Sequence, residues 1–463
     1  MQLTKQQIKI IVILVAGAFF VSLNQTLLTP AMPTIMVDMG VDSATVQWLT
    51  SGYALVEAVI IPLNAFLLGR FGARRLFIFG LSVFAIGSVA CGVAPNFVLL
   101  MVGRVMQAVA TGAMMPAVFT VILLIFPKER RGSAMGLVGL VLSISPAIGP
   151  VISGVLIDTI GWRYEFALVA VFAVILAIWS VFSLKGVNEF PRIGFDALSV
   201  VLLAVGMVPL LYGLSTIASS ENALIPVAMI ALGVVVLGFF AYRQLHLDVP
   251  ILNVATLKTR NFCVGAITVT LLQGLTIAAS VVFPLLAQNA MGYSATLSGL
   301  LMLPGILIGS VTGILAGRFF DKHGARGISI LGGIVLVVGF ALYLVCGIDA
   351  SMVAITAVFA VPCFGINLLV NPINTWGLNS LPNSEIAHGN AINSTFEQAG
   401  ASLGTGLVVG LTALGAPLAG ATASAAQQSF MGCHVSYIAL TAIAVIITAV
   451  ILIFVHDGKR NAE

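Results

Sequence analysis

Long runs of apolar residues, separated by short polar segments, fill almost the whole chain. A bilayer core of about 30 Å takes roughly 20 apolar residues of α-helix to cross. About fourteen such runs can be placed, beginning near residues 9, 46, 76, 97, 133, 163, 196, 223, 262, 296, 327, 351, 388 and 434. With 60% hydrophobic and only 8% charged residues, no soluble class fits. The sequence therefore predicts an all-α polytopic membrane protein with 14 transmembrane helices.

A short basic loop occurs twice, at residues 69–75 and 317–326, each time between two apolar runs. Placing Gly72 on Gly324 also places Arg74 on Arg326. Because the same loop follows the second apolar run of each half, the chain is predicted to be a duplicated helical bundle.

This loop resembles the segment after the second helix in the major facilitator superfamily of secondary transporters. The second copy matches the family pattern at Gly317, Asp321, Gly324 and Arg326. The first copy has Gly69 where the family usually has Asp, so the carboxylate of the motif is expected only in the second half. The resemblance implies a gating role for Arg70, Gly72, Arg74, Asp321, Gly324 and Arg326.

The end of the first apolar run narrows the resemblance to the fourteen-helix drug:proton antiporters, a branch that includes lincomycin-resistance exporters. Thr26 and Pro33 stand at positions typical of that branch, whereas Asn24 replaces its usual Asp. Since the Asn side chain is not an acid, a proton-coupled protein of this kind needs its proton carrier elsewhere.

The fifth apolar run is similar to the glycine-rich stretch of antiporters in the same family. It contains Gly149, Pro150 and Gly154, with Ser153 replacing one glycine of the pattern. The resemblance adds Gly149, Pro150 and Gly154 to the gating motifs. A plain packing face explains the glycines equally well, because small residues let membrane helices approach closely.

Two acids and one arginine are embedded in apolar runs. Glu57 stands about eleven residues from the first basic loop, a depth of roughly 17 Å along a helix, and Glu397 is at comparable depth. A carboxylate there costs several kcal/mol unless it is protonated, paired or hydrated. Glu57 and Glu397 are therefore predicted to carry the coupling proton, with Arg104 biasing one of them. The alternatives are a neutral Glu bonded between helices and an Arg that braces backbone carbonyls.

Amide side chains within the runs predict a polar lining for a central cavity. The predicted substrate-cavity residues are Asn24, Gln25, Gln107, Gln273, Asn367 and Asn371. Asn367, Asn371 and Asn374 share one helical face at spacings of four and three. Hydrogen bonding between helices is the alternative for this row.

Charge distribution predicts the orientation. With the N-terminus inside, all of the 20 Lys and Arg residues except Arg104 and Arg163 fall on the cytoplasmic side. Both termini are thus expected in the cytoplasm of a bacterial-type plasma membrane. The net charge of +4 reflects this orientation and predicts no nucleic-acid partner. The five cysteines have no metal-ligand spacing, so neither a metal site nor a disulfide is predicted.

Taken with the resemblance, these features predict the major facilitator fold. The predicted domains are a six-helix bundle at 1–188, two inserted helices with a connector at 189–260, and a second six-helix bundle at 261–463. The inserted pair occupies the place where twelve-helix relatives have only a loop, and the sequence assigns it no chemistry.

No phosphate-binding loop occurs, so an ion gradient is expected to drive transport. The predicted function is proton-coupled multidrug efflux by alternating access, with amphipathic substrates such as lincosamides or cationic dyes. The expected protein is a monomeric transporter in contact with membrane lipids, not an enzyme, with protons as coupling ion and no cofactor. The alternatives are a dedicated exporter of one endogenous lipid, peptide or antibiotic and, with less support, a nutrient symporter or a membrane sensor.

Overall fold

A computed structural model describes residues 4–456 except 185–195, 218–219, 221 and 421–422. The described residues form sixteen α-helices. In chain order the helices are α1 (Lys5–Met39), α2 (Ser43–Val46), α3 (Trp48–Ile60), α4 (Asn64–Gly92), α5 (Phe97–Ile125), α6 (Arg131–Thr159), α7 (Arg163–Ser183), α8 (Ala197–Thr216), α9 (Leu224–His246), α10 (Arg260–Leu285), α11 (Ala295–His323), α12 (Arg326–Val345), α13 (Met352–Asn379), α14 (Ile386–Ala413), α15 (Gly415–Ala419) and α16 (Ala425–Phe454). The short helical turns are η1 (Ile61–Leu63), η2 (Lys128–Arg130), η3 (Val254–Lys258), η4 (Leu286–Ala290, a π-helix) and η5 (Asn383–Glu385).

Twelve helical stretches of the described chain are long and apolar enough to cross a membrane. One of them, Trp48–Gly92, has 45 residues and is interrupted at Gly72, where the backbone leaves the helical region. The 29-residue α6 is a further long helix outside these twelve. With the two arms of Trp48–Gly92 taken separately and α6 added, the helices reproduce the predicted number of crossings. The all-helical membrane fold is confirmed.

The two basic loops make the same backbone turn. Gly72 has φ 74° and ψ 155°, and Gly324 has φ 86° and ψ −171°. Such positive φ values favour glycine, which lacks the Cβ that would clash. Before Gly72, residues further along the chain contact residues further along α5. After Gly72, residues further along the chain contact earlier residues of α5. The chain therefore reverses its direction at this glycine.

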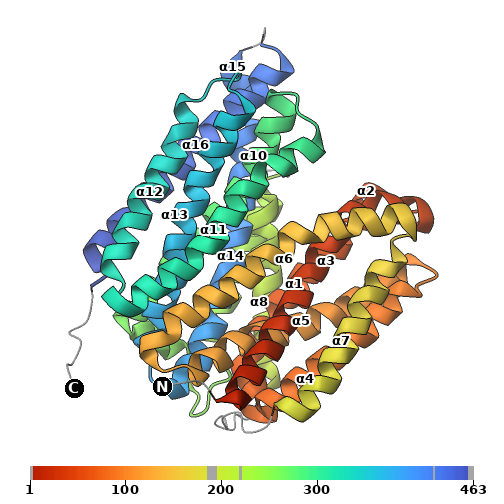
Figure 1. Cartoon of the computed structure of the whole chain (residues 1–463), viewed down its shortest axis with the longest axis vertical. Helices are drawn as coiled ribbons and strands as arrows, with labels where there is room; N and C mark the ends of the chain where they lie inside the picture. Colours follow the sequence, from red (N-terminus) through yellow and green to blue (C-terminus); the bar gives the residue numbers. More distant parts are fainter. Residues whose placement is uncertain (1–3, 185–195, 218–219, 221, 421–422, 457–463) are drawn as a thin grey trace.

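The helices form two bundles that meet at one end and diverge toward the other (Figure 1). One bundle contains α1 and α3–α7, and the other contains α10–α14 and α16. The helix α8 packs on α9 and lies against both α3 and α14, so the inserted pair stands at the boundary between the bundles. The predicted boundary at residue 188 lies outside the described residues.

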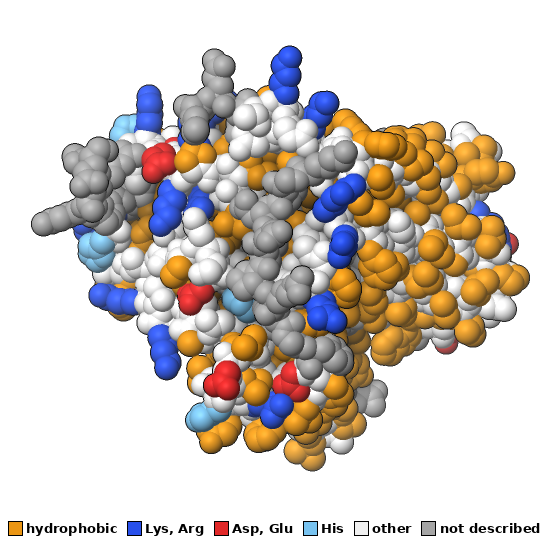
Figure 2. Space-filling view, turned by 90° about the horizontal axis from the view of Figure 1, so that it is seen from below, with side chains coloured by type: hydrophobic (Ala, Val, Ile, Leu, Met, Phe, Trp, Pro, Cys, Tyr) orange, Lys and Arg blue, Asp and Glu red, His pale blue; other side chains and the backbone are white. Residues whose placement is uncertain are grey.

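The end where the bundles meet is also the basic end. Lys and Arg side chains gather on this face, whereas apolar side chains cover the flanks visible beside it (Figure 2). The first turn of α1 and the last turn of α16 lie toward the same end (Figure 1). We refer to it as the basic end and to the opposite one, near α2 and α15, as the outer end.

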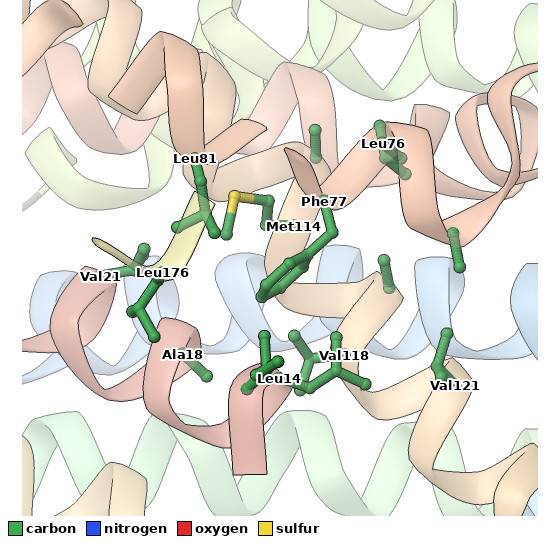
Figure 3. Packing of buried hydrophobic residues seen from close by; sticks show 14 of the residues in the cluster. Leu14, Ala18, Val21, Leu76, Phe77, Leu81, Met114, Val118, Val121 and Leu176 are labelled. Atoms are coloured by element: carbon green, nitrogen blue, oxygen red, sulfur yellow. The ribbon is translucent and has the colours of Figure 1, made fainter. Parts of the chain in front are cut away.

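Each bundle has its own apolar core. In the first, Phe77 of α4 packs among Leu14 of α1 and Val118 of α5 (Figure 3). A Cβ on Gly17 would lie 2.6 Å from the Phe77 ring, so the ring fits against α1 at this position because the residue there is glycine. In the second core, the rings of Tyr343 and Tyr437 are stacked 3.8 Å apart. Burial of these large side chains fixes each bundle as a unit.

The helix α6 of the first bundle contacts each bundle with a different part of its length. Near the basic end it crosses α11, and a Cβ on Gly136 would lie 2.6 Å from the Gly313 carbonyl oxygen. Toward the outer end it packs on α1, where Ser145 Oγ donates to the Phe19 carbonyl at 2.9 Å. Gly136 and Gly313 thus allow the backbones of α6 and α11 to touch, and so bring the two bundles together at the basic end.

Candidate functional site

A buried arginine organises the polar groups inside the first bundle. Arg104 is 1% exposed and donates through Nε to the Leu49 carbonyl at 3.1 Å and through Nη1 to Gln107 Oε1 at 2.8 Å. Its guanidinium also stacks 4.3 Å from the centre of the Tyr53 ring. Within the described residues no carboxylate forms an ion pair with it. The bracing role that the sequence left as an alternative for Arg104 is thus present in the structure.

Gln107 extends this arrangement to neighbouring helices. Asn24 Nδ2 of α1 donates to Gln107 Oε1 at 3.3 Å, and Gln107 Nε2 donates to Ser88 Oγ of α4 at 2.8 Å. We call Asn24, Ser88, Arg104 and Gln107 the central polar network. It joins α1, α4 and α5, and with the Leu49 contact it includes α3.

Glu57 lies beside this network without being bonded to it. Its carboxylate accepts one hydrogen bond, from Gln25 Nε2 at 3.2 Å, and its side chain is 8% exposed. Asn24 and Gln25 are consecutive, so α1 contacts both the arginine network and the acid. No ion pair joins Glu57 to Arg104 among the described residues.

The second embedded acid, Glu397 of α14, is partly exposed. No described residue gives it a hydrogen bond or an ion pair. Gln273 of α10 is likewise partly exposed and has no hydrogen bond within the described chain. Glu397 and Gln273 therefore have polar atoms without a described protein partner.

The three amides of the predicted row on α13 make three different contacts. Asn374 Oδ1 accepts from Asn393 Nδ2 at 2.8 Å, which links α13 to α14. Asn367 donates to the Cys363 carbonyl of its own helix at 3.0 Å. Asn371 is 8% exposed and faces α6, since a Cβ on Gly139 would lie 2.7 Å from its Nδ2. Asn371 therefore lies at the contact between the bundles.

Asp321 of the second basic loop fastens the two bundles at the basic end. Its carboxylate accepts from the backbone N–H groups of Gly132 at 2.9 Å and Ser133 at 2.8 Å, and also from the Ser133 hydroxyl. These donors are unpaired groups of the first turn of α6, where the helix dipole favours negative charge. A carboxylate of one bundle thus caps a helix of the other.

Arg131, the first residue of α6, adds a second bridge at the same end. Nη1 donates to Asn379 Oδ1 at 3.0 Å, and Nη2 donates to Asn383 Oδ1 at 3.1 Å. Nearby, Asn390 Nδ2 of α14 donates to Thr120 Oγ1 of α5 at 3.0 Å. The basic end is closed by these contacts between the bundles.

Other predicted gating residues lie within one bundle. Arg74 donates to the Val181 carbonyl near the end of α7 at 2.6 Å, and Arg70 is exposed. Arg326 begins α12, directly after the turn at Gly324. A Cβ on Gly149 would overlap Thr26 of α1, whereas one on Gly154 would meet no atom within 4 Å. Pro150 stands between these glycines in α6, and its side chain lies outside the described part.

A charged cluster joins α1 to α7 at the outer end. Asp38 accepts from Trp162 Nε1 at 3.1 Å and forms an ion pair with Arg163. The hydrogen bonds from Arg163 and Trp162 hold the pKa of Asp38 below its usual value. Glu165, in the first turn of α7, is 2% exposed. Ser153 Oγ donates to its Oε1 at 2.5 Å, and its Oε2 has no partner among the described residues.

A membrane bundle of two similar halves, closed at one end and with polar groups at its centre, defines a secondary transporter. The chain belongs to the Major Facilitator Superfamily, whose family model matches residues 14–405. It is 38% identical over 411 residues to the uncharacterised MFS-type transporter YhcA of Bacillus subtilis, covering 87% of this chain and 76% of that protein. It is 32% identical over 410 residues to the lincomycin resistance protein LmrB of Listeria monocytogenes, covering 88% and 87%.

Solved structures share the fold. The human organic anion transporter MFSD10 matches with a TM-score of 0.66 at 11% identity, covering 97% of this chain and all of that one. The assignment to a transporter family, and to no enzyme, follows from these comparisons. They also confirm the family resemblance that the basic loops and the first-helix motif predicted.

Sequence reasoning missed several residues of the site. Tyr53, which stacks on Arg104, belongs to no sequence motif. Its contact with Arg104 depends on how α3 is aligned with α5. Arg131 was counted only as a marker of orientation. Its position at the start of a helix, where a cation is unfavourable, was a signal that it needs a partner.

Proposed function

We propose that the chain is a proton-coupled exporter of amphipathic drugs. It works by alternating access in a bacterial-type plasma membrane, with the basic end and both termini in the cytoplasm. Two kinds of support lead to this proposal. The chain is similar along most of its length to a lincomycin resistance protein, and the concentration of Lys and Arg at one end follows the positive-inside rule.

The observation that carries the proton coupling is the environment of Glu57. Its carboxylate is buried in the bundle and, among the described residues, accepts one hydrogen bond, from the neutral Gln25 side chain. An ionised carboxylate in such a place requires water or a cation. Glu57 therefore holds a proton while it is shielded and releases it when the bundle movement or a cationic substrate changes its surroundings.

Glu397 supplies the corresponding acid in the second bundle. It is partly exposed and is not bonded by any described side chain, so it exchanges protons with the space between the bundles more readily than Glu57. The Arg104 guanidinium is stabilised by the Gln107 and Leu49 oxygens and by the Tyr53 ring. Its role is to hold α3 and α5 in register around Glu57.

In the transport cycle, the closed basic end represents the state open to the outside. Protons from the outside load the acids, and separation of Asp321 from α6 then permits opening of the basic end. Substrate entering from the cytoplasm displaces the proton. Each proton that moves inward gains about 2.3 kcal/mol per 100 mV of membrane potential.

The test is proton release from everted membrane vesicles challenged with ethidium and then with lincomycin. The parent is expected to release protons on addition of either compound. Glu57→Gln keeps the Gln25 contact and the size of the side chain but removes the acid, and it should bind substrate without releasing a proton. Glu397→Gln shows whether the second acid is also required.

Asp349→Asn is the matched control, because this exposed carboxylate lies at the outer end of the second bundle. It should couple as the parent does. Normal coupling in both Glu variants would refute the proton-site assignment. No proton response of the parent to either compound would favour a dedicated exporter of one endogenous lipid, peptide or antibiotic.

A further inference from the structure

A cavity of about 290 Å³ lies where α3, α8 and α14 meet. We call it the lateral pocket. Its walls include Trp48, Ser51, Tyr212, Ser215, Gln398 and Ser402. The volume is close to the lower limit of about 300 Å³ for small-molecule sites in proteins. The pocket shares no residue with the central polar network or with the acids considered above.

The wall formed by α8 is attached to the second bundle. A Cβ on Gly406 of α14 would overlap the Leu214 carbonyl oxygen of α8, so the two backbones are in direct contact there. The hairpin itself is equally tight, since a Cβ on Gly213 would lie 2.7 Å from the Pro226 carbonyl oxygen of α9. The inserted pair is therefore in backbone contact with α14 of the second bundle.

The facing wall belongs to the first bundle. Tyr53 of α3 is hydrogen-bonded through its hydroxyl to Thr111 of α5 at 2.5 Å, and Leu49 of α3 accepts from Arg104. These bonds fasten α3 to α5. Because the two walls belong to different bundles, any rocking of the bundles changes the volume of the lateral pocket.

Packing along α8 explains where the pocket lies. Leu203, Met207 and Leu211 are at most 5% exposed and share an apolar cluster with Ala58 of α3 and Ile392 of α14. This cluster seals the junction toward the basic end. Leu211 itself and Tyr212, which is 41% exposed, line the pocket, so the pocket begins at this end of the cluster.

The lining is aromatic and neutral. Trp48 is 47% exposed, and Trp48 and Tyr212 are the two aromatic residues among the described lining. Gln398, Ser51 and Ser402 add groups that donate or accept hydrogen bonds, and no charged side chain is among the described lining residues. Aromatic faces bind organic cations whose charge is delocalised, and they do so without a carboxylate.

We propose that the lateral pocket is a binding site for aromatic organic cations and that the inserted α8–α9 pair forms one wall of the substrate route. The proposal rests on the proposed export function and assigns to it a substrate class and a place. A bound molecule contacts both bundles and so favours the arrangement whose pocket fits it.

The experiment measures ethidium binding to the full chain in lipid nanodiscs by the increase in dye fluorescence. Ser215→Trp fills the pocket from α8, and Ser402→Trp fills it from α14. Thr356→Trp is the matched control. Like Ser215, Thr356 is a partly exposed helical hydroxyl bonded to a carbonyl of its own helix. It lines a separate apolar groove of about 340 Å³ between α11 and α13.

Both pocket variants should raise the Kd of ethidium about tenfold or more, which corresponds to about 1.4 kcal/mol, and the control should bind as the parent does. Folding is checked by size-exclusion chromatography, and Tyr212→Leu replaces a pocket variant that fails to fold. Parent-like affinity of the pocket variants, or no saturable binding to the parent, would overturn the proposal.

Ethidium export from cells separates this proposal from the export function. A parent that binds ethidium in a pocket-dependent manner but does not export it supports the pocket and contradicts the export function. A parent that exports ethidium while the filled-pocket variants bind it normally supports export and contradicts the pocket.

Discussion

Replacing Asp321 with Asn should weaken the closure of the basic end. The carboxylate accepts two backbone hydrogen bonds at 2.9 and 2.8 Å from the first turn of α6, and a third from the Ser133 hydroxyl. Bonds to a charged acceptor contribute roughly 1.5–3 kcal/mol, against about 0.5–1.5 for neutral ones. The helix dipole adds a few tenths. Because Asp321 is partly exposed, we expect a loss of about 2 kcal/mol for the closed state.

A loss of about 2 kcal/mol changes the equilibrium between the closed and open basic end roughly 30-fold. Spin labels on Lys128→Cys and His323→Cys report this equilibrium. Both positions are exposed and lie on opposite bundles at the basic end. The labels are placed in a chain whose five native cysteines are replaced by Ala, and the distance distribution is measured by pulsed electron resonance.

The Asp321→Asn variant should show a larger fraction of long distances than the parent. Asp349→Asn removes the same charge from the outer end of the same bundle and should leave the distribution unchanged. If Asp321→Asn and the parent give the same distribution, the cap on α6 does not hold the basic end closed, and the gating argument fails.

Three further outcomes follow from the described contacts. Gly149→Val should lower the thermal unfolding temperature well below that of Gly154→Val, because only the first adds a Cβ where another helix already lies. Arg104→Lys should destabilise the chain by about 1–3 kcal/mol in denaturation, because it leaves buried oxygens without a donor. The Asp38 contact with Arg163 lowers the pKa of this carboxyl, so it contributes stability above about pH 4 and loses it as the pH falls further. Thermal unfolding should therefore depend on acid pH more steeply in the parent than in Asp38→Asn, and equal slopes would contradict this.

The fold could be predicted from sequence because a bilayer imposes a simple rule. Apolar runs that are long enough to cross the bilayer as helices become spans. Most other structures are excluded because they would leave backbone N–H and C=O groups without hydrogen bonds inside the bilayer. The duplicated loop could also be aligned correctly, since Gly72 and Gly324 adopt similar turns that require glycine. Steric requirements of this kind can be recognised in the sequence because glycine meets them far better than other residues.

The partners within the site could not be predicted in the same way. The bonds of Arg131 to Asn379 and Asn383 join residues about 250 positions apart. Nothing in the local pattern specifies which helices meet, and an amide is compatible with either a cavity or an interhelical bond. Asn374 illustrates this ambiguity, because it bonds Asn393 although its neighbours in the row have other roles. The lateral pocket was missed for the same reason: it exists only where three distant segments meet.

The two halves close the basic end by different physical means. Asp321 caps α6 in one half, but Gly69 leaves the corresponding position without a carboxylate. There Ala387, the second residue of α14, packs in the apolar core of the first bundle. The connector after α9 bonds the same region, since the Asn253 N–H donates to His388 Nδ1 at 3.1 Å. The Asp321 carboxylate thus holds one side of the closure, whereas apolar packing and the Arg131 and Asn390 hydrogen bonds hold the other. Neutralising Asp321 therefore weakens only part of the contact that must separate for the basic end to open.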